Sequence, residues 1–253
     1  MLWVRLLTHM NLIESIQRRG QRQCRRRQVG KAYDMALEVA RVVPRRTRVL
    51  DVGCGNGFIA HHLTALLGTR VVGLDVTEAT AAQIEYLRYD GRRFPLPDHS
   101  FDAVLLCYVL HHAQDLRAVL HEVRRVLRAG GLIVVYEDIP VGLWDRFMCW
   151  THDLQWRGRT GHCSFRREPE WRTLFDSFGF EVIAERPLSR WRNLTYPVRH
   201  RFYVLKSHGV EKHAQTFPTA ARRRSALAHT RASVQETEAR PNVISSSSEP
   251  TRT

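Results

Sequence analysis

The sequence predicts an α/β fold, a three-layer sandwich in which a mostly parallel sheet lies between two layers of helices. A short apolar run at residues 49–52 stops in closely spaced glycines, and a new apolar segment follows at once, as at a junction of strand, turn and helix. A second apolar run, residues 70–75, ends in a carboxylate. A third, residues 101–108, is continuously apolar in its centre, as a strand buried on both faces of a parallel sheet has to be.

Hydrophobic spacing and helix-breaking residues assign the elements of the first half of the chain. In residues 29–43, apolar residues recur three and four positions apart, which predicts an amphipathic helix that stops before Pro44. Gly68 ends the next helix, and Thr77 can cap a short third one. The expected elements are a helix over residues 29–43, a strand over 49–52, a helix over 58–67, a strand over 70–75, a short helix over 77–83 and a strand within 84–89.

The second half of the chain continues the alternation and then departs from it. The expected elements are a strand over residues 101–108, a helix over 113–127, a strand over 132–136, a helix over 168–178 and two closing strands over 180–184 and 200–205. Residues 139–167 break this regular pattern and are rich in aromatic residues and histidine.

The glycine turn is the most informative local feature. Gly53, Gly55 and Gly57 permit backbone angles and a close approach of a ligand that a Cβ would block. Asp75, at the end of the next strand, is placed to accept hydrogen bonds from both hydroxyl groups of a ribose. A nicotinamide dinucleotide site needs a third glycine where this sequence has Phe58, so that kind of site is disfavoured.

These residues resemble the class I S-adenosylmethionine-dependent methyltransferases, in their type 11-like, small-molecule branch. The resemblance extends over residues 30–206 and rests on an ordered series of motifs: Val49–Gly57, Arg70–Asp75, Tyr89–Gly91, Phe94–Asp102, Val109–His112 and Arg125–Gly131. It implies a Rossmann-like fold with a seven-stranded, mostly parallel sheet whose last strand is antiparallel.

The same resemblance implies S-adenosyl-L-methionine as the cofactor. The helix that starts at Phe58 offers free N–H groups and a positive dipole end to the carboxylate of the methionine part. Asp90 matches the family residue that contacts the adenine amino group, although the connection between Asp75 and Asp90 is shorter than is usual for a crossover. The expected cofactor-binding residues are Asp51, Gly53, Cys54, Gly55, Gly57, Asp75, Val76, Asp90, Gly91 and Cys107.

Two further groups of residues are candidates for chemistry on the acceptor. His111 and His112 follow the fourth strand and could act as a general base, or they could simply cap or pack under neighbouring structure. Residues 139–167 resemble the substrate lid of the family, with Glu137, Asp138, Trp144, His152 and Trp156 as candidate lid residues. His152, His162 and Cys163 have no recognised ligand spacing, so no metal site is expected.

Composition and charge suggest how the remaining chain is organised. The formal charge is +14, nearly all of it from arginine, which invites a nucleic-acid interpretation, but much of it lies outside the motifs, as in solvated tails. We expect a poorly ordered basic arm over residues 1–28, a methyltransferase domain over 29–206 with the lid at 139–167, and a disordered tail over 207–253. Five cysteines without a paired spacing suggest a reducing compartment, and no segment reads as a membrane span, so a cytoplasmic location is expected.

The sequence thus favours methyl transfer to a small molecule, at oxygen or carbon, as in quinone or natural-product synthesis. A nucleic-acid methyltransferase is the second interpretation, and a noncatalytic cofactor-binding regulatory module is the third. Neither the Asn/Asp-Pro-Pro-Tyr signature nor a Pro-Cys nucleophile motif is present to support the second.

Overall fold

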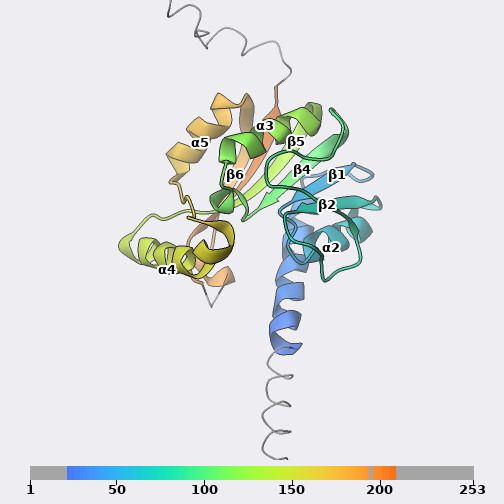
Figure 1. Ribbon diagram of the computed structural model, residues 1–253. Helices are drawn as coiled ribbons and strands as arrows, with labels where there is room; N and C mark the ends of the chain where they lie inside the picture. The colour runs from blue at the N-terminus through green and yellow to red at the C-terminus, as the bar shows by residue number, and fades with distance from the viewer. Residues whose placement is uncertain (1–21, 194–195, 209–253) are drawn as a thin grey trace, which may run out of the picture. The chain divides into compact units, whose positions relative to one another are not determined.

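The computed structural model describes residues 22–193 and 196–208. Within these residues, seven strands form one sheet in the order β3-β2-β1-β4-β5-β7-β6 (Figure 1). Strand β7 is antiparallel to both of its neighbours, and the other pairs are parallel. This arrangement confirms the predicted fold class.

The bounds of most elements lie near the expected ones. The strands are β1 (Val49–Val52), β2 (Val71–Asp75), β3 (Glu85–Arg88), β4 (Phe101–Cys107), β5 (Leu127–Asp138), β6 (Phe180–Leu188) and β7 (His200–Ser207). The helices are residues 22–40, α2 (Phe58–Leu67), η1 (Leu110–His112), α3 (Leu116–Val126), α4 (Leu143–Thr160), α5 (Glu168–Ser177) and η2 (Arg190–Arg192).

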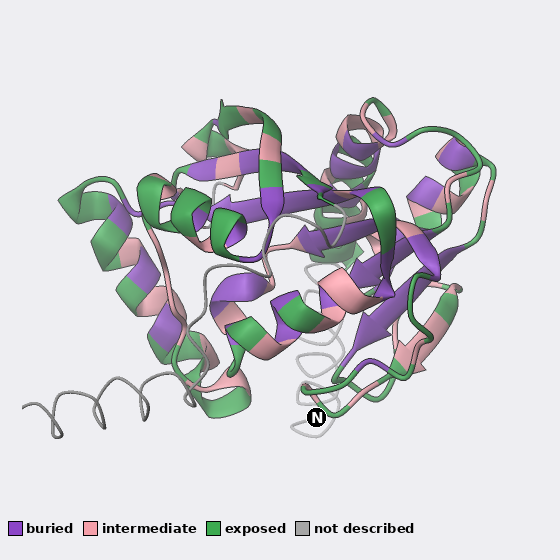
Figure 2. Ribbon diagram, turned by 90° about the horizontal axis from the view of Figure 1, so that it is seen from above, coloured by how far each residue is buried: buried purple, intermediate pink, exposed green. Residues whose placement is uncertain are grey.

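The central strands bury both of their faces. Alternate residues of a strand point to opposite sides of the sheet. Leu50 accordingly packs in a cluster with residues of α3 and α5, whereas its neighbour Val49 packs with residues of α2 and of the helix over 22–40. Figure 2 shows the central strands buried along their length and the helices exposed on their outer turns. The sheet is therefore the middle of three layers, and its carboxyl edge stays available to a ligand.

The segment between β2 and β3 is a loop, so the predicted short helix over Thr77–Gln83 is wrong. Its backbone bonds to neighbouring segments: the Thr77 N–H donates to the Asp75 carboxylate (3.1 Å), and the Ala82 N–H donates to the Asn56 carbonyl (3.0 Å). These hydrogen bonds give the backbone groups of the loop partners outside a helix and join the loop to the glycine turn. A helix would therefore add no hydrogen bond for these groups.

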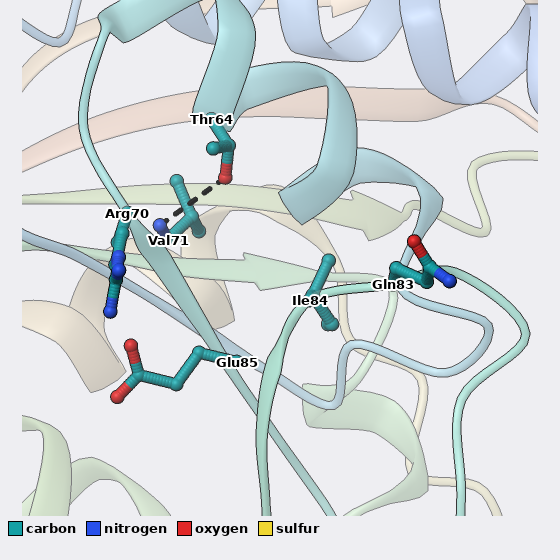
Figure 3. Close-up of a pocket in the computed structure, with 6 residues that line it drawn as sticks. All are labelled: Thr64, Arg70, Val71, Gln83, Ile84 and Glu85. Atoms are coloured by element: carbon teal, nitrogen blue, oxygen red, sulfur yellow. Dashed lines mark hydrogen bonds between the residues drawn. The ribbon is translucent and has the colours of Figure 1, made fainter.

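The missing helix leaves a hollow beside β2 and β3 (Figure 3). Its lining residues are Thr64, Arg70, Val71, Gln83, Ile84 and Glu85. Arg70 precedes β2 and Asp75 ends it, so the hollow lies away from the carboxyl edge where ligands bind in open parallel sheets. The Ile84 side chain packs against β2, because a Cβ on Gly73 would lie 2.6 Å from its Cδ1 atom.

Several boundaries differ from prediction: the first helix begins and ends earlier, at residues 22 and 40, β5 and β6 are longer, and α4 lies where no regular element was expected. The helix before β1 already includes residues 22–28, which the prediction gave to the basic arm; they contain neither glycine nor proline, and arginine and glutamine are good helix formers. Strand β5 starts at Leu127 because Leu127 pairs with Phe101 before an irregularity in the ladder. Ser207, predicted to begin the tail, is the last residue of β7. Residues 1–21 and the tail beyond residue 208 lie outside the described residues.

Glu38 joins the helix over residues 22–40 to strands β5 and β6 and to η2. Its two carboxylate oxygens lie 2.7 and 3.0 Å from the guanidinium nitrogens of Arg192, and Arg186 is 3.0 Å away. The Tyr136 hydroxyl also donates to Glu38 (2.8 Å). Burial opposes the charge, but these three donors lower the pKa of Glu38 to about 2.

We expect Glu38→Gln to lower the free energy of unfolding by about 2 kcal/mol, because Arg192 and Tyr136 lose a charged acceptor in a mostly buried place. The low pKa of Glu38 stabilises the fold fully above the ordinary pKa of a glutamate, and this contribution is lost as pH falls towards 2. Urea unfolding at pH 7 and pH 3 measures both effects, and the difference between variant and parent should shrink at pH 3. Glu78→Gln is the matched control, since Glu78 pairs with Arg88 on the exposed surface. Equal losses in both variants would contradict the prediction.

Candidate active site

The glycine turn after β1 lies against the end of β2. The Gly53 N–H donates to the Leu74 carbonyl (2.7 Å), and the Gly55 N–H donates to the Asp75 carboxylate (2.8 Å). Gly53 has a φ of +68°, and a Cβ there would lie 2.2 Å from Val109 Cγ2. Only glycine satisfies both the left-handed backbone and this close approach. The turn therefore brings the segment after β4 directly against the end of β1.

The next part of the turn leaves room for a ligand. A Cβ on Gly55 would meet no described atom within 4 Å. Helix α2 starts just beyond, and its N-cap, Gly57, provides no side-chain hydrogen bond to the first turn. The N–H groups of that turn and the positive end of the helix dipole therefore suit a negatively charged group.

Asp51 is a buried carboxylate without a partner. It is 1% exposed, and neither of its oxygens accepts a hydrogen bond of normal geometry from the described part of the chain. Burial and then the nearby Asp75 carboxylate raise the pKa of Asp51 to about 7, and the Ala60 N–H offsets this only in part. An unpaired buried carboxylate is costly, so this position favours a ligand that brings a positive charge.

The residues predicted to hold adenosine lie at the ends of β2 and β3. Asp75 is buried, and each of its oxygens accepts one backbone N–H, from Gly55 and from Thr77, which leaves a lone pair on each oxygen for further donors. Val76 is about half exposed, and a Cβ on Gly91 would lie 3.7 Å from Val76 Cγ1. Val76 and Gly91 are thus neighbours beside Asp75, as the prediction requires.

Asp90 stands at the outer side of this group. It is exposed, and its Oδ1 atom accepts the N–H groups of Arg92 and Arg93 (2.9 and 3.0 Å). These two backbone hydrogen bonds lower the pKa of Asp90. Its carboxylate is therefore ionised and fixed in position by the turn that follows it.

His111 and Glu137 form a buried pair at the ends of β4 and β5. His111 Nδ1 lies 2.6 Å from Glu137 Oε2, and Glu137 Oε1 accepts the Leu110 N–H (2.9 Å). Burial disfavours a charged imidazole, but the Glu137 carboxylate outweighs it and raises the pKa of His111. Since a carboxylate can only accept, His111 carries a proton on Nδ1. Its Nε2 atom is buried and has no hydrogen-bond partner among the described residues.

His112, His152 and Trp156 converge on the same place. His112 Nε2 lies 3.2 Å from His152 Nε2, and the Trp156 ring packs edge-on against the His112 ring, with centroids 5.3 Å apart. Burial, together with the other histidines, lowers the pKa of His112 to about 3 and that of His152 to about 4, so both rings are neutral at physiological pH. Helix α4 thus closes over the carboxyl edge through its middle and last turns.

Sequence reasoning missed two residues of this region. Lys31 reaches in from the helix over 22–40, and its Nζ atom lies 5.1 Å from the centre of the Tyr108 ring. Burial lowers the pKa of Lys31, and the Asp138 carboxylate compensates only in part. Tyr108 has a φ of +58°, a conformation that is strained for a residue with a side chain and is concentrated at functional sites. Neither residue gives a local sequence signal, because both are placed by packing between distant elements.

Other residues near the site serve the structure, among them the predicted residues Asp138, Trp144, Cys54 and Cys107. Asp138 accepts from His200 Nδ1 (2.6 Å), and Asp153 accepts the Cys163 N–H (2.7 Å) after the end of α4. Trp144 lies at the other end of α4, where its indole donates to the Pro197 carbonyl (3.2 Å), so it does not join Trp156 and His152. Burial raises the pKa of both Cys54 and Cys107, which makes these thiols small packing groups and not nucleophiles.

Comparison with known proteins agrees with this geometry. Residues 50–135 match the family described as "Methyltransferase domain". A sterol 24-C-methyltransferase of Gibberella zeae is 34% identical over 111 residues, which is 39% of this chain and 29% of that protein. A protein of Mycolicibacterium smegmatis described as an S-adenosylmethionine-dependent methyltransferase is 43% identical over 94 residues, or 34% of this chain and 36% of that protein.

A solved structure shares the fold over a longer stretch. An S-adenosylmethionine-dependent methyltransferase from Methanosarcina mazei superposes with a TM-score of 0.54 at 19% identity, covering 67% of this chain and 96% of that one. Residues 50–135 thus match a methyltransferase domain, and the sheet order and the glycine turn of the described residues agree with the fold of the class I S-adenosylmethionine-dependent methyltransferases. The chain spans less than a third of the length of the sterol methyltransferase that it matches.

The described residues contain no candidate for a membrane-spanning helix. Helix α4, with 18 residues, is long enough, but it carries too many charged side chains and too little apolar character to cross a bilayer.

Proposed function

We propose that this chain transfers a methyl group from S-adenosylmethionine to a small-molecule acceptor, at oxygen or carbon. The observation that carries the proposal is Asp51, a buried carboxylate that has no cationic partner among the described residues and lies beside an open glycine turn. The amino-acid end of this cofactor would give Asp51 a cationic amino group and would give the first turn of α2 a carboxylate. When bound, the cofactor supplies an electrophilic methyl group on a sulfonium, which is already a good leaving group.

The remaining cofactor contacts follow from the same placement. Asp75 has the lone pairs to accept two ribose hydroxyl groups. Val76 and Gly91 offer an apolar edge and a bare backbone to the adenine ring, and the fixed Asp90 carboxylate can accept from its amino group. The turn containing Cys54 and the end of β4 at Cys107 complete the walls.

At the acceptor end, the geometry favours His111 over His112 as the residue that faces the reacting atom. Glu137 holds the Nδ1 proton of His111, so the Nε2 lone pair is directed away from Glu137 and is unused. His112 Nε2 is engaged with His152 instead. Glu137 is in this scheme a positioning residue, because it orients His111 and does not itself reach the acceptor.

The outer face of α4 indicates an apolar acceptor. Leu143, Phe147, Trp150 and Leu154 follow each other at helical spacing along one face, and each is at least 48% exposed. An exposed apolar face on the helix that carries His152 suits contact with an apolar partner surface, and an acceptor with a large apolar portion, such as a prenylated quinol or a sterol, is found on such a surface. The names of the sterol methyltransferases among the relatives agree with this class.

The test is an acceptor screen that measures formation of S-adenosylhomocysteine. We expect product with apolar phenols, polyprenyl quinols or sterols, and none with transfer or ribosomal RNA at physiological salt. Product with RNA alone would move the assignment to nucleic acid. Cofactor binding by calorimetry without product from any acceptor would favour a noncatalytic module.

The affinity for the cofactor should rise with pH between 6 and 7.5. Asp51 has a pKa of about 7 in the free protein and must be ionised to pair with an amino group, so binding below that pH requires a proton to be released. Calorimetry with S-adenosylhomocysteine, which carries the same amino-acid end, should show affinity falling several-fold from pH 7.5 to pH 6. Asp51→Asn should bind more weakly and lose this pH dependence. An equal slope in the variant would contradict the role given to Asp51.

A further inference from the structure

We propose that His111, His112 and His152 form a binding site for a divalent transition metal of the Zn²⁺ type. One nitrogen from each of these side chains lies within 4.8 Å of the other two. The three rings come from two elements, η1 and the middle of α4, and they meet at the carboxyl edge of the sheet. Three imidazoles around one point are a common ligand set for zinc, with the fourth position left open.

The unused nitrogen of His111 is the first reason to expect a ligand here. Its Nε2 atom is buried and has no hydrogen-bond partner among the described residues, although its Nδ1 atom is tightly bonded to Glu137. A buried ring nitrogen costs free energy when its lone pair accepts no hydrogen bond and binds no ligand. A metal ion provides the missing partner.

The orientation of His111 is the one that metal-binding histidines adopt. A carboxylate that accepts the N–H of one ring nitrogen fixes the tautomer and makes the other nitrogen a better ligand. Glu137 is completely buried and is fixed in turn by the Leu110 N–H. Glu137 thus orients the His111 ring so that its Nε2 lone pair points away from the carboxylate.

The distances fit as well. Two nitrogens bound tetrahedrally to zinc at ordinary bond lengths lie roughly 3.3 Å apart, and His112 Nε2 and His152 Nε2 are 3.2 Å apart. Cys163 Sγ and Thr160 Oγ1 lie near the other nitrogen of His112, at 3.3 and 3.1 Å, so they can support that ring from behind.

The open fourth position gives the site a use that rests on the proposed function. With the metal bound, His111 would face the reacting atom as a ligand of the metal and not through a free lone pair. An acceptor hydroxyl bound there would have its pKa lowered by the metal and would lose its proton to water on binding, as an oxygen nucleophile requires. The aromatic rings of Trp156 and Phe165 beside the histidines would limit the access of water. Metal binding itself does not depend on this use, and it is measured separately.

The experiment compares the full-length parent, His152→Ala and His61→Ala after equilibrium dialysis against zinc sulfate, with the metal quantified by mass spectrometry. His61→Ala is the matched control, since His61 and His62 are another adjacent pair, with ring centroids 5.5 Å apart, on α2. We expect one zinc ion per chain in the parent and in His61→Ala, and at least a tenfold loss of affinity in His152→Ala. Substitution by Co²⁺ should give the visible absorption of a tetrahedral complex in the parent and in His61→Ala only.

A second variant keeps the proposal testable if His152→Ala folds poorly. Glu137→Gln removes the carboxylate but keeps the shape, and we expect it to weaken zinc binding about 10- to 100-fold. Circular dichroism and calorimetry with S-adenosylhomocysteine establish that each variant is folded and still binds cofactor, so loss of zinc is separated from failure of the methyltransferase assignment. Absence of bound zinc in the parent, or equal zinc affinity in the parent and His152→Ala, would overturn the proposal. In that case the 3.2 Å contact is an ordinary hydrogen bond between two neutral rings.

Discussion

Gly53→Ala should abolish measurable binding of S-adenosylmethionine. A residue with a side chain at a φ of +68° costs about 1–2 kcal/mol, and the new Cβ would also lie 2.2 Å from Val109 Cγ2. The turn has to move, and with it the backbone that closes the cofactor cleft. We expect a loss in affinity of at least about 100-fold, which corresponds to about 2.7 kcal/mol. Calorimetry with S-adenosylhomocysteine gives the value directly, and urea unfolding gives the accompanying loss of stability.

Two variants separate the steric clash from the effect on the ligand. Gly53→Ala combined with Val109→Gly removes the side chain that clashes, so part of the stability should return. Gly55→Ala also has a left-handed backbone but meets no described atom within 4 Å, so it should lose less stability than Gly53→Ala while the new methyl group still occupies space meant for the ligand. If Gly53→Ala binds the cofactor like the parent, the turn is not the cradle of the cofactor.

Asp75→Ala should be the second most damaging change. The carboxylate is buried and already accepts the N–H groups of Gly55 and Thr77, and we propose that it also accepts two ribose hydroxyl groups. Charge-assisted hydrogen bonds of this kind contribute about 1.5–3 kcal/mol each, so we expect a fall in cofactor affinity of about 100-fold or more. The same calorimetric titration measures this affinity. Asp75→Asn keeps one acceptor oxygen, so its affinity should lie between that of Asp75→Ala and that of the parent.

Asp90→Ala is the matched control for that experiment. Asp90 is exposed, and its hydrogen bonds within the turn are on the surface, where water replaces them readily. We therefore expect a clearly smaller loss of affinity than for Asp75→Ala, confined to ligands that carry the adenine amino group. A loss as large as that of Asp75→Ala, or one that persists with an inosine analogue, would contradict the roles given to the two carboxylates.

The proposed zinc site changes how the lid is understood. Helix α4 presents its aromatic face outwards and contributes His152 inwards, so a metal would join the lid to η1 below it. The sequence predicts no metal site, because His152, His162 and Cys163 have no recognised ligand spacing. The three histidines come instead from segments that are about forty residues apart, and no spacing rule covers that arrangement.

What the sequence determined by itself is the sheet and the glycine turn. A left-handed turn at Gly53, a continuous apolar run in β4 and a carboxylate after β2 each depend on the sterics and periodicity of a few neighbouring residues, so they can be read locally. The same local signals failed at residues 77–83, where hydrogen bonds to Asp75 and Asn56 replaced the helix that the pattern suggested.

Only the tertiary structure decided which side chains meet at the acceptor end. Lys31 is placed near Tyr108 by the packing of the helix over residues 22–40, and His152 is placed beside His112 by α4 folding back over the sheet edge. Contacts of this kind depend on how distant elements pack. The packing is set by the fit of whole helix and sheet faces to one another, which no short stretch of sequence shows. The pairing of His111 with Glu137 has the same origin, since the ends of parallel strands β4 and β5 are brought together only when the sheet forms.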